Sequence, residues 1–145
     1  MSNRAYLGFD YGTKSIGVAV GQSETRLAQP LGHVGVRQGT PDWDAIARLI
    51  ADWRPDALVV GLPLNMDDSE NALTHAATKF GNRLSGRYNL RVHFVDERLT
   101  SVMAKNALLE AGVSLKHANK NKIDALSAQI LLQAFLDDGA DTANR

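Results

Sequence analysis

The sequence has no cysteine, which excludes disulfides, thiolate catalysis and zinc sites built on cysteine. No apolar run approaches the roughly 20 residues that a membrane-spanning helix needs, and the N-terminus lacks the pattern of a signal peptide. We therefore expect a cytoplasmic protein with no membrane partner. Lysine and arginine balance aspartate and glutamate, 16 against 16, so the net charge gives no overall support for nucleic-acid binding.

The length of 145 residues suits one domain with a substantial core. We predict that this domain spans residues 1–138 and that 139–145 form a polar tail. Strand-like runs lie at residues 6–10, 16–20, 27–36, 57–60 and 90–97. The first three are joined by short links typical of antiparallel pairing, whereas helical patterns separate the later ones. This order predicts an α/β fold, a five-stranded mixed sheet with helices on both faces.

Helix signals lie between and after the later strands. Thr40, Pro41 and Asp42 are typical of a helix start, and a second helical stripe follows the polar turn at residues 65–69. A short helix is expected from Thr100 or Ser101 to residue 112, and a final helix over residues 121–137. The predicted buried stripe of that last helix consists of Ile123, Leu126, Ile130 and Ala134.

Asp10 stands at the end of the first apolar strand. Aspartate is unusual there, because it disfavours sheets and its charge is costly to bury. Gly8 and Gly12 flank it and leave room for another group to approach the backbone. A carboxylate at such an open strand end suits a divalent cation, or a phosphate held through one. The alternative is a hairpin in which Asp10 caps the turn.

Two further carboxylates fall at comparable places. Glu97 closes the fifth strand, and Asp124 is expected in the first turn of the last helix. Ligands gather at the carboxyl ends of parallel strands, so the three acids can meet at one rim. Such a cluster would need a cation or raised pKa values, and it suits two Mg²⁺ ions about 4 Å apart on a phosphodiester. Structural alternatives are an ion pair of Glu97 with Arg98 or Arg91, and a helix-dipole role for Asp124.

Basic residues gather between the last two acids. Residues 98–122 contain five lysines and arginines against one acid, Glu110. This cluster could neutralise phosphates, although a solvated surface explains it equally well. The segment 113–122 could order on nucleic acid or serve as a connector, and Lys14, beside Asp10, could face phosphate or only solvent. The candidate substrate-binding residues are Lys14, Arg98, Thr100, Lys116, Lys120 and Lys122.

Four motifs follow one another along the chain. They are GFDYGTKSIGVA at residues 8–19, VGLPLN at 60–65, DERLTS at 96–101 and KIDALSA at 122–128. Their sequence and order resemble the YqgF/RuvX family, the Holliday-junction-resolvase-like or pre-16S rRNA nucleases. The resemblance extends over nearly the whole chain, from Tyr6 to about Leu136.

The resemblance implies an RNase H-like fold and a cytoplasmic nuclease that uses Mg²⁺ or Mn²⁺ and processes the 5′ end of pre-16S rRNA. It implies that Asp10, Glu97 and Asp124 are both the catalytic and the metal-binding residues. The expected partner is nucleic acid, with pre-rRNA favoured and branched DNA as the alternative, and the protein is expected to be a monomer or a weak homodimer. Many other RNase H-like nucleases carry the middle acid on the fourth strand, which here ends in Gly61-Leu62-Pro63.

Two other functions fit parts of the sequence. Asp10-x-Gly12-Thr13 also resembles the first phosphate loop of actin-like and sugar-kinase ATPases, but the second phosphate loop of those proteins is absent from the sequence. A non-catalytic nucleic-acid-binding module on the same fold is the other alternative. Three clustered acids argue against it, because a pure phosphate binder gains nothing from them.

Overall fold

The computed structural model describes residues 3–98 and 120–138. In these ranges six strands form one mixed sheet with the order β4-β3-β2-β1-β5-β6. β1 pairs antiparallel with β2 and parallel with β5, and β5 pairs parallel with β6. The strands are β1 (Ala5–Asp10), β2 (Ser15–Gln22), β3 (Leu27–Arg37), β4 (Thr40–Pro41), β5 (Ala57–Leu62) and β6 (Arg91–Asp96).

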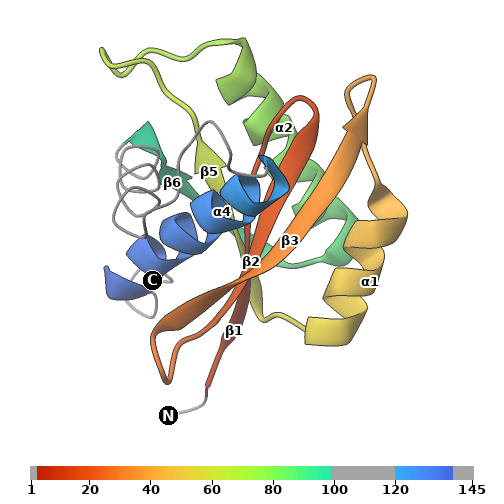
Figure 1. The fold of residues 1–145 in the computed structure, drawn as a ribbon, viewed down its shortest axis with the longest axis vertical. Helices are drawn as coiled ribbons and strands as arrows, with labels where there is room; N and C mark the ends of the chain where they lie inside the picture. The colour runs from red at the N-terminus through yellow and green to blue at the C-terminus, as the bar shows by residue number, and fades with distance from the viewer. Residues whose placement is uncertain (1–2, 99–119, 139–145) are drawn as a thin grey trace.

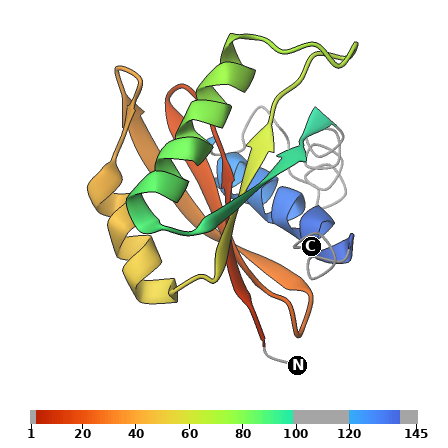
Figure 2. The same cartoon turned by 180° about the vertical axis from the view of Figure 1, so that it is seen from behind.

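The described helices cover both faces of this sheet. α1 (Trp43–Trp53) and α2 (Ala72–Tyr88) pack on one face, and α4 (Lys120–Asp137) packs on the other, as Figures 1 and 2 show from opposite sides. This confirms the predicted α/β architecture with helices on both faces. None of the helices described is both long and apolar enough to cross a membrane.

The sheet has one strand more than the five predicted. Residues 40–41, interpreted from sequence as a helix start, form the short edge strand β4 beside Val36 and Arg37. The turn between β3 and β4 explains this, because Gln38 and Gly39 both have positive φ and fold the chain straight back. The cap of α1 is instead Asp42, whose side chain accepts a hydrogen bond from the Ala45 N–H at 3.1 Å.

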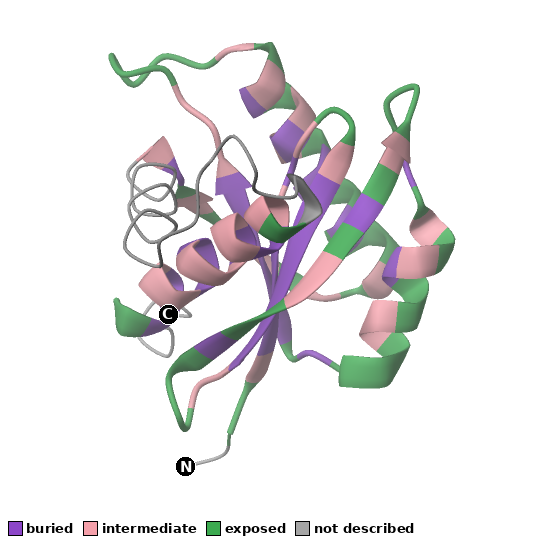
Figure 3. Cartoon of the chain, viewed as in Figure 1, coloured by how far each residue is buried: buried purple, intermediate pink, exposed green. Residues whose placement is uncertain are grey.

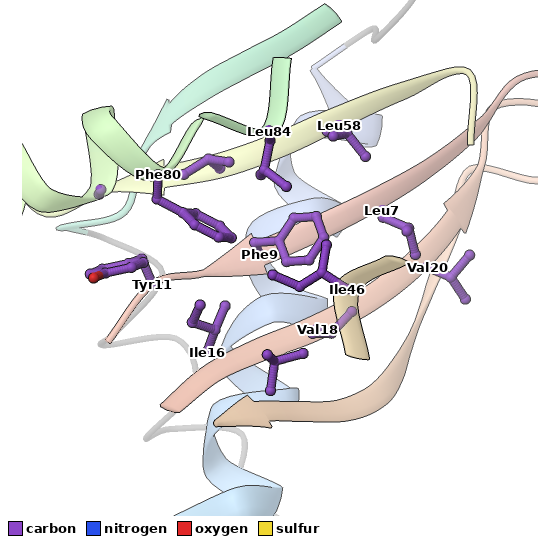
Figure 4. Close-up of a cluster of buried hydrophobic side chains, with 13 residues drawn as sticks. Leu7, Phe9, Tyr11, Ile16, Val18, Val20, Ile46, Leu58, Phe80 and Leu84 are labelled. Carbon is purple, nitrogen blue, oxygen red and sulfur yellow. The ribbon is translucent and has the colours of Figure 1, made fainter. Parts of the chain in front are cut away.

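The larger core lies between the sheet and α1 and α2 (Figure 4). Leu7 and Phe9 of β1 point into it, together with Val18 of β2 and Phe80 of α2. The ring centroids of Phe9 and Phe80 lie 5.6 Å apart in an edge-on arrangement. Because side chains alternate along a strand, the even-numbered residues of β1 must face α4. The central strands β1 and β2 are buried over most of their length, as Figure 3 shows.

The second core lies under α4, and here the predicted helix face is wrong. Ile123, Leu126, Ile130 and Ala134 are only half-buried. The buried residues of the helix are Ala125, Ala128, Leu131, Leu132, Phe135 and Leu136. Apolar residues occur on all sides of α4 itself. Their spacing along the sequence therefore did not show which side of the helix packs against the sheet.

Several predicted features fall outside the described residues. These are the short helix from residue 100 to 112, the basic residues of 113–119 and the polar tail 139–145. The last helix begins at Lys120 rather than at about residue 121, so Asp124 lies beyond its first turn. The domain boundary at residue 138 stays a prediction.

Candidate functional site

The carboxyl ends of the three parallel strands, β1, β5 and β6, lie together at one end of the sheet. β1 ends at Asp10, β5 at Leu62 and β6 at Asp96, and the pairing registers place these ends side by side. A Cβ on Gly8 would lie 3.0 Å from the Cβ of Leu132 in α4, so the face of β1 that carries Gly8 and Asp10 is the face covered by α4. Asp10 thus lies where the sequence predicted it, at the carboxyl end of β1, and its side chain is half-buried.

Glu97 directly follows β6 and is only 9% exposed. Its backbone N–H donates to the carbonyl of Leu62 at 3.2 Å, which holds residue 97 against the end of β5. Burial, a hydrogen bond with the Asp10 side chain and the negative charges of Asp10 and Asp96 raise the pKa of Glu97 from 4.5 to about 9. Burial and the neighbouring negative charges disfavour the charged form of Glu97, so in the absence of a metal ion the two carboxyls should hold one proton between them near pH 7.

This arrangement gives Glu97→Gln an expected effect on stability. Between pH 4.5 and about 9 the folded metal-free protein holds a proton on Glu97 that the unfolded chain has lost. Stability should therefore fall as the pH rises through that window. The neutral amide of the introduced glutamine can still donate to Asp10, so the variant should lose this slope and exceed the wild type in stability toward pH 9.

Urea unfolding across that pH range, with a chelator present, measures the slope for both proteins. Glu24→Gln, which removes an exposed carboxylate in the turn between β2 and β3, is the matched control and should keep the wild-type slope. Parallel curves for wild type and Glu97→Gln would show that the two carboxyls do not share a proton.

Gly61, the fifth residue of β5, makes room for the Glu97 carboxyl. A Cβ at this position would come closer to Glu97 Oε2 than real Cβ contacts allow, and would lie 3.0 Å from Leu131 in α4. A larger side chain at position 61 would therefore displace the carboxyl of Glu97.

Asp124 lies in the second turn of α4, beside the start of β2. Its Oδ2 accepts a hydrogen bond from the Ser15 hydroxyl. Its backbone carbonyl packs so closely against Gly17 that a Cβ there would have no room. Gly17 is the residue of β2 that pairs with Asp10 of β1. The helix-dipole interpretation therefore does not describe Asp124, whose side chain reaches back to the sheet. Sequence reasoning missed Ser15 and Gly17 as supporting residues, although both lie inside the first motif.

The three acids therefore occupy one end of one face of the sheet. Asp10 and Glu97 contact each other, while Asp124 is held by Ser15. In the part of the chain that is described, no three histidine, cysteine, aspartate or glutamate side chains are already arranged to hold a metal ion. The available donors are all carboxylate oxygens, the ligands that Mg²⁺ and Mn²⁺ prefer. A cation could replace the proton that Asp10 and Glu97 share, so the residues fit such an ion.

Arg98 has a role that differs from the one predicted. Its guanidinium contacts Asp96 at 2.5 Å and Asp68 at 2.7 Å, and donates to the backbone carbonyl of Asn65 at 3.1 Å. Hydrogen bonding from Arg98 lowers the pKa of Asp96. The sequence alternative of a Glu97–Arg98 ion pair is thus replaced by an Asp96–Arg98 pair. Arg98 ties the end of β6 to the loop that follows β5, and its substrate-binding role stays a prediction.

Of the remaining candidate substrate-binding residues, the structure describes Lys14, Lys120 and Lys122. Lys14 is exposed in the turn after β1, and its carbonyl accepts a hydrogen bond from the Val36 N–H at 3.0 Å. Lys122 is exposed on α4, and Lys120 is its first residue. Thr100 and Lys116 lie outside the described residues. Binding of substrate by these side chains stays a prediction.

Comparison with solved structures identifies the fold class. RuvC of T. thermophilus, solved in complex with a Holliday junction substrate, is similar with a TM-score of 0.57 at 20% identity, over 96% of this chain and 97% of that one. This likeness shows an RNase H-like fold and confirms the fold predicted from the resemblance.

The family follows from sequence. The model of the family described as "RuvX: Holliday junction resolvase" matches residues 4–138, and the chain belongs to that family. A protein of Aeromonas salmonicida named "Putative pre-16S rRNA nuclease" is 51% identical over 138 residues, which are 95% of this chain and 98% of that protein. A protein of the same name from Escherichia coli O157:H7 is 50% identical over 133 residues, 92% of this chain and 96% of that protein.

Proposed function

We propose that this protein is a divalent-metal-dependent nuclease that hydrolyses phosphodiester bonds in the 5′ region of pre-16S rRNA. The observation that supports this most is the contact of Asp10 with Glu97, two carboxyls joined by a hydrogen bond at the carboxyl ends of parallel strands. Membership of the RuvX family and the names of its relatives favour a nuclease acting on ribosomal RNA precursors. A protein that processes ribosomal RNA precursors would act in the cytoplasm.

Each residue of the site would have a defined role in this reaction. Asp10, Glu97 and Asp124 would hold one or two Mg²⁺ or Mn²⁺ ions, which when bound polarise the phosphodiester and lower the pKa of the attacking water. The Ser15 hydroxyl fixes the Asp124 carboxylate, and Gly61 leaves space for that of Glu97. The Lys14 ammonium would contact a phosphate next to the cleaved bond.

Branched DNA is the second candidate substrate. The description of the family model favours it, as does the Holliday junction bound by the T. thermophilus relative of similar fold. Both substrates offer the same phosphodiester chemistry, so the carboxylates alone do not select between them. Selection must come from surfaces outside the three acids.

Cleavage of the two substrates by the purified protein tests the proposal. Wild type with Mg²⁺ or Mn²⁺ should cut an RNA that spans the 5′ end of 16S rRNA and its leader, and should cut a four-way DNA junction more slowly. Faster cutting of the junction would replace the RNA substrate by branched DNA. Binding without metal-dependent cutting of either would make the protein a non-catalytic nucleic-acid-binding module.

A further inference from the structure

The surface of α2 carries a line of basic residues at every fourth position. His75, Lys79, Arg83 and Arg87 are all exposed. The helix, Ala72–Tyr88, contains no aspartate or glutamate at all. The chain as a whole has equal numbers of acidic and basic residues, so this helix departs locally from a balanced composition. We call these four residues the α2 stripe.

Two cations of the stripe, Lys79 and Arg83, have no ion-pair partner among the described residues. Like charges four residues apart repel each other on a helix surface and destabilise the helix. Arg87 stacks on Trp43, with its Cζ 4.1 Å from the ring centre. The repulsion between Lys79 and Arg83 is therefore not offset by an ion pair in the described part of the chain, and an anionic partner would relieve it.

The stripe borders a hollow between α2 and the start of α1. This hollow has a volume of about 190 Å³, and its basic rim is formed by Lys79 and Arg83. Its floor is apolar and aromatic, formed by Tyr11, Trp43 and Phe80 among others. Phe80 and Tyr11 are only 2% and 8% exposed and Arg87 stacks on Trp43, so these rings line the hollow and do not offer free faces to bases. The feature that suits a nucleic-acid strand is the pair of cations on its rim, which can contact phosphates.

A second hollow adjoins this one and extends to Lys14, in the turn between β1 and β2. It has a volume of about 620 Å³ and is lined by Lys14 and Arg37, and Pro41 borders both hollows. Asp42 is an acid on its wall, but its carboxylate already caps α1. Lys14 lies in the turn that follows Asp10. Cations therefore lie along both hollows, from Lys14 in the turn after Asp10, past Arg37 in the β3–β4 hairpin, to Lys79 and Arg83 of α2.

We propose that this surface, formed by Lys14, Arg37 and the α2 stripe, binds the phosphate backbone of a single RNA strand that flanks the cleaved bond. Four residues of helix rise by about 6 Å, so neighbouring cations of the stripe can contact successive phosphates of one strand. The inference rests on the proposed function, because it gives the RNA a path away from Asp10. The stripe is the surface outside the three acids that holds the substrate.

The salt dependence of RNA binding tests this surface. Lys79→Gln/Arg83→Gln removes two cations from the stripe, while Gln keeps a long side chain and a similar helix propensity. Arg4→Gln/Arg26→Gln removes two exposed cations near the opposite end of the sheet and is the matched control. All three proteins carry Asp10→Asn, and a chelator prevents cleavage. Affinity for a labelled single-stranded oligouridine is then measured over a series of KCl concentrations.

The stripe variant should show a slope of log affinity against log salt that is shallower by about 1.4, since each lost phosphate contact contributes roughly 0.7 for single strands. The control variant should keep the slope of its parent, and the melting temperature of the stripe variant should not fall. Equal slopes in the stripe and control variants would overturn the inference, as expected if the stripe serves a protein partner. This readout needs no cleavage, so failure of the wild type to cut RNA would refute the proposed function separately.

Discussion

Asp10→Asn should strongly reduce metal-dependent cleavage while leaving the fold intact. The substitution removes the charge but almost none of the shape, and the carbonyl of the new side chain can still accept the hydrogen bond of Glu97. We expect the cleavage rate to fall on the order of 10³-fold, in the range of a positioned catalytic side chain. Stability without metal should stay the same or increase, because residue 10 no longer opposes a charge on Glu97.

Single-turnover cleavage and urea unfolding measure the two effects on the same preparations. Asp52→Asn, which neutralises an exposed acid on α1, serves as the control and should match the wild type in both assays. Cleavage by Asp10→Asn within a few-fold of the wild-type rate would remove Asp10 from the catalytic site. A large loss of stability would mean that Asp10 is structural.

Gly17→Ala should have the largest effect on stability. Its Cβ would lie well under 3.0 Å from the carbonyl oxygen of Asp124, and backbone atoms cannot yield as a flexible side chain can. α4 would have to move off the sheet, which breaks the Ser15–Asp124 hydrogen bond and opens the second core. We expect a loss of about 3 kcal/mol, the upper end for overpacking, and a matching loss of cleavage because Asp124 moves.

The neighbouring strand offers a matched control for this substitution. Gly35 lies on β3 opposite Ser15, and a Cβ there would meet nothing within 4 Å. Gly35→Ala should therefore unfold at the wild-type urea concentration or slightly above it, because alanine restricts the unfolded chain. If the two variants were equally stable, close packing of α4 on Gly17 could not be what positions Asp124.

The sequence was most informative where chemistry and strand position coincide. Asp10 and Glu97 follow apolar strand patterns, and a charged residue at such a place has few structural reasons to be there. The fold class and the family were predicted from the same motifs, and both are confirmed. The sequence predicted that the acids can meet at one rim, but not that Asp10 and Glu97 are joined by a hydrogen bond, because this detail depends on how β1, β5 and β6 lie side by side.

Other features depended on tertiary packing. Apolar residues occur on all sides of α4, so they do not show which side packs against the sheet. The glycines Gly8 and Gly17 show instead which face of the sheet α4 can approach closely. The short strand β4 forms because Gln38 and Gly39 have positive φ angles and turn the chain back on itself. The Thr40-Pro41 pattern had instead indicated a helix start. Arg98 was interpreted as a partner of Glu97 or of substrate, yet contacts in the loop after β5 determine its position.

The most direct test of the central claim is the stabilisation of the protein by Mn²⁺. If Asp10 and Glu97 hold a cation where they now share a proton, the free energy of unfolding should rise with Mn²⁺ concentration. The gain should be about 2.7 kcal/mol at a hundred times the dissociation constant, and Asp10→Asn should show almost none. An unfolding free energy that is unaffected by Mn²⁺ in the wild type, or raised equally in Asp10→Asn, would contradict a metal site at these carboxylates.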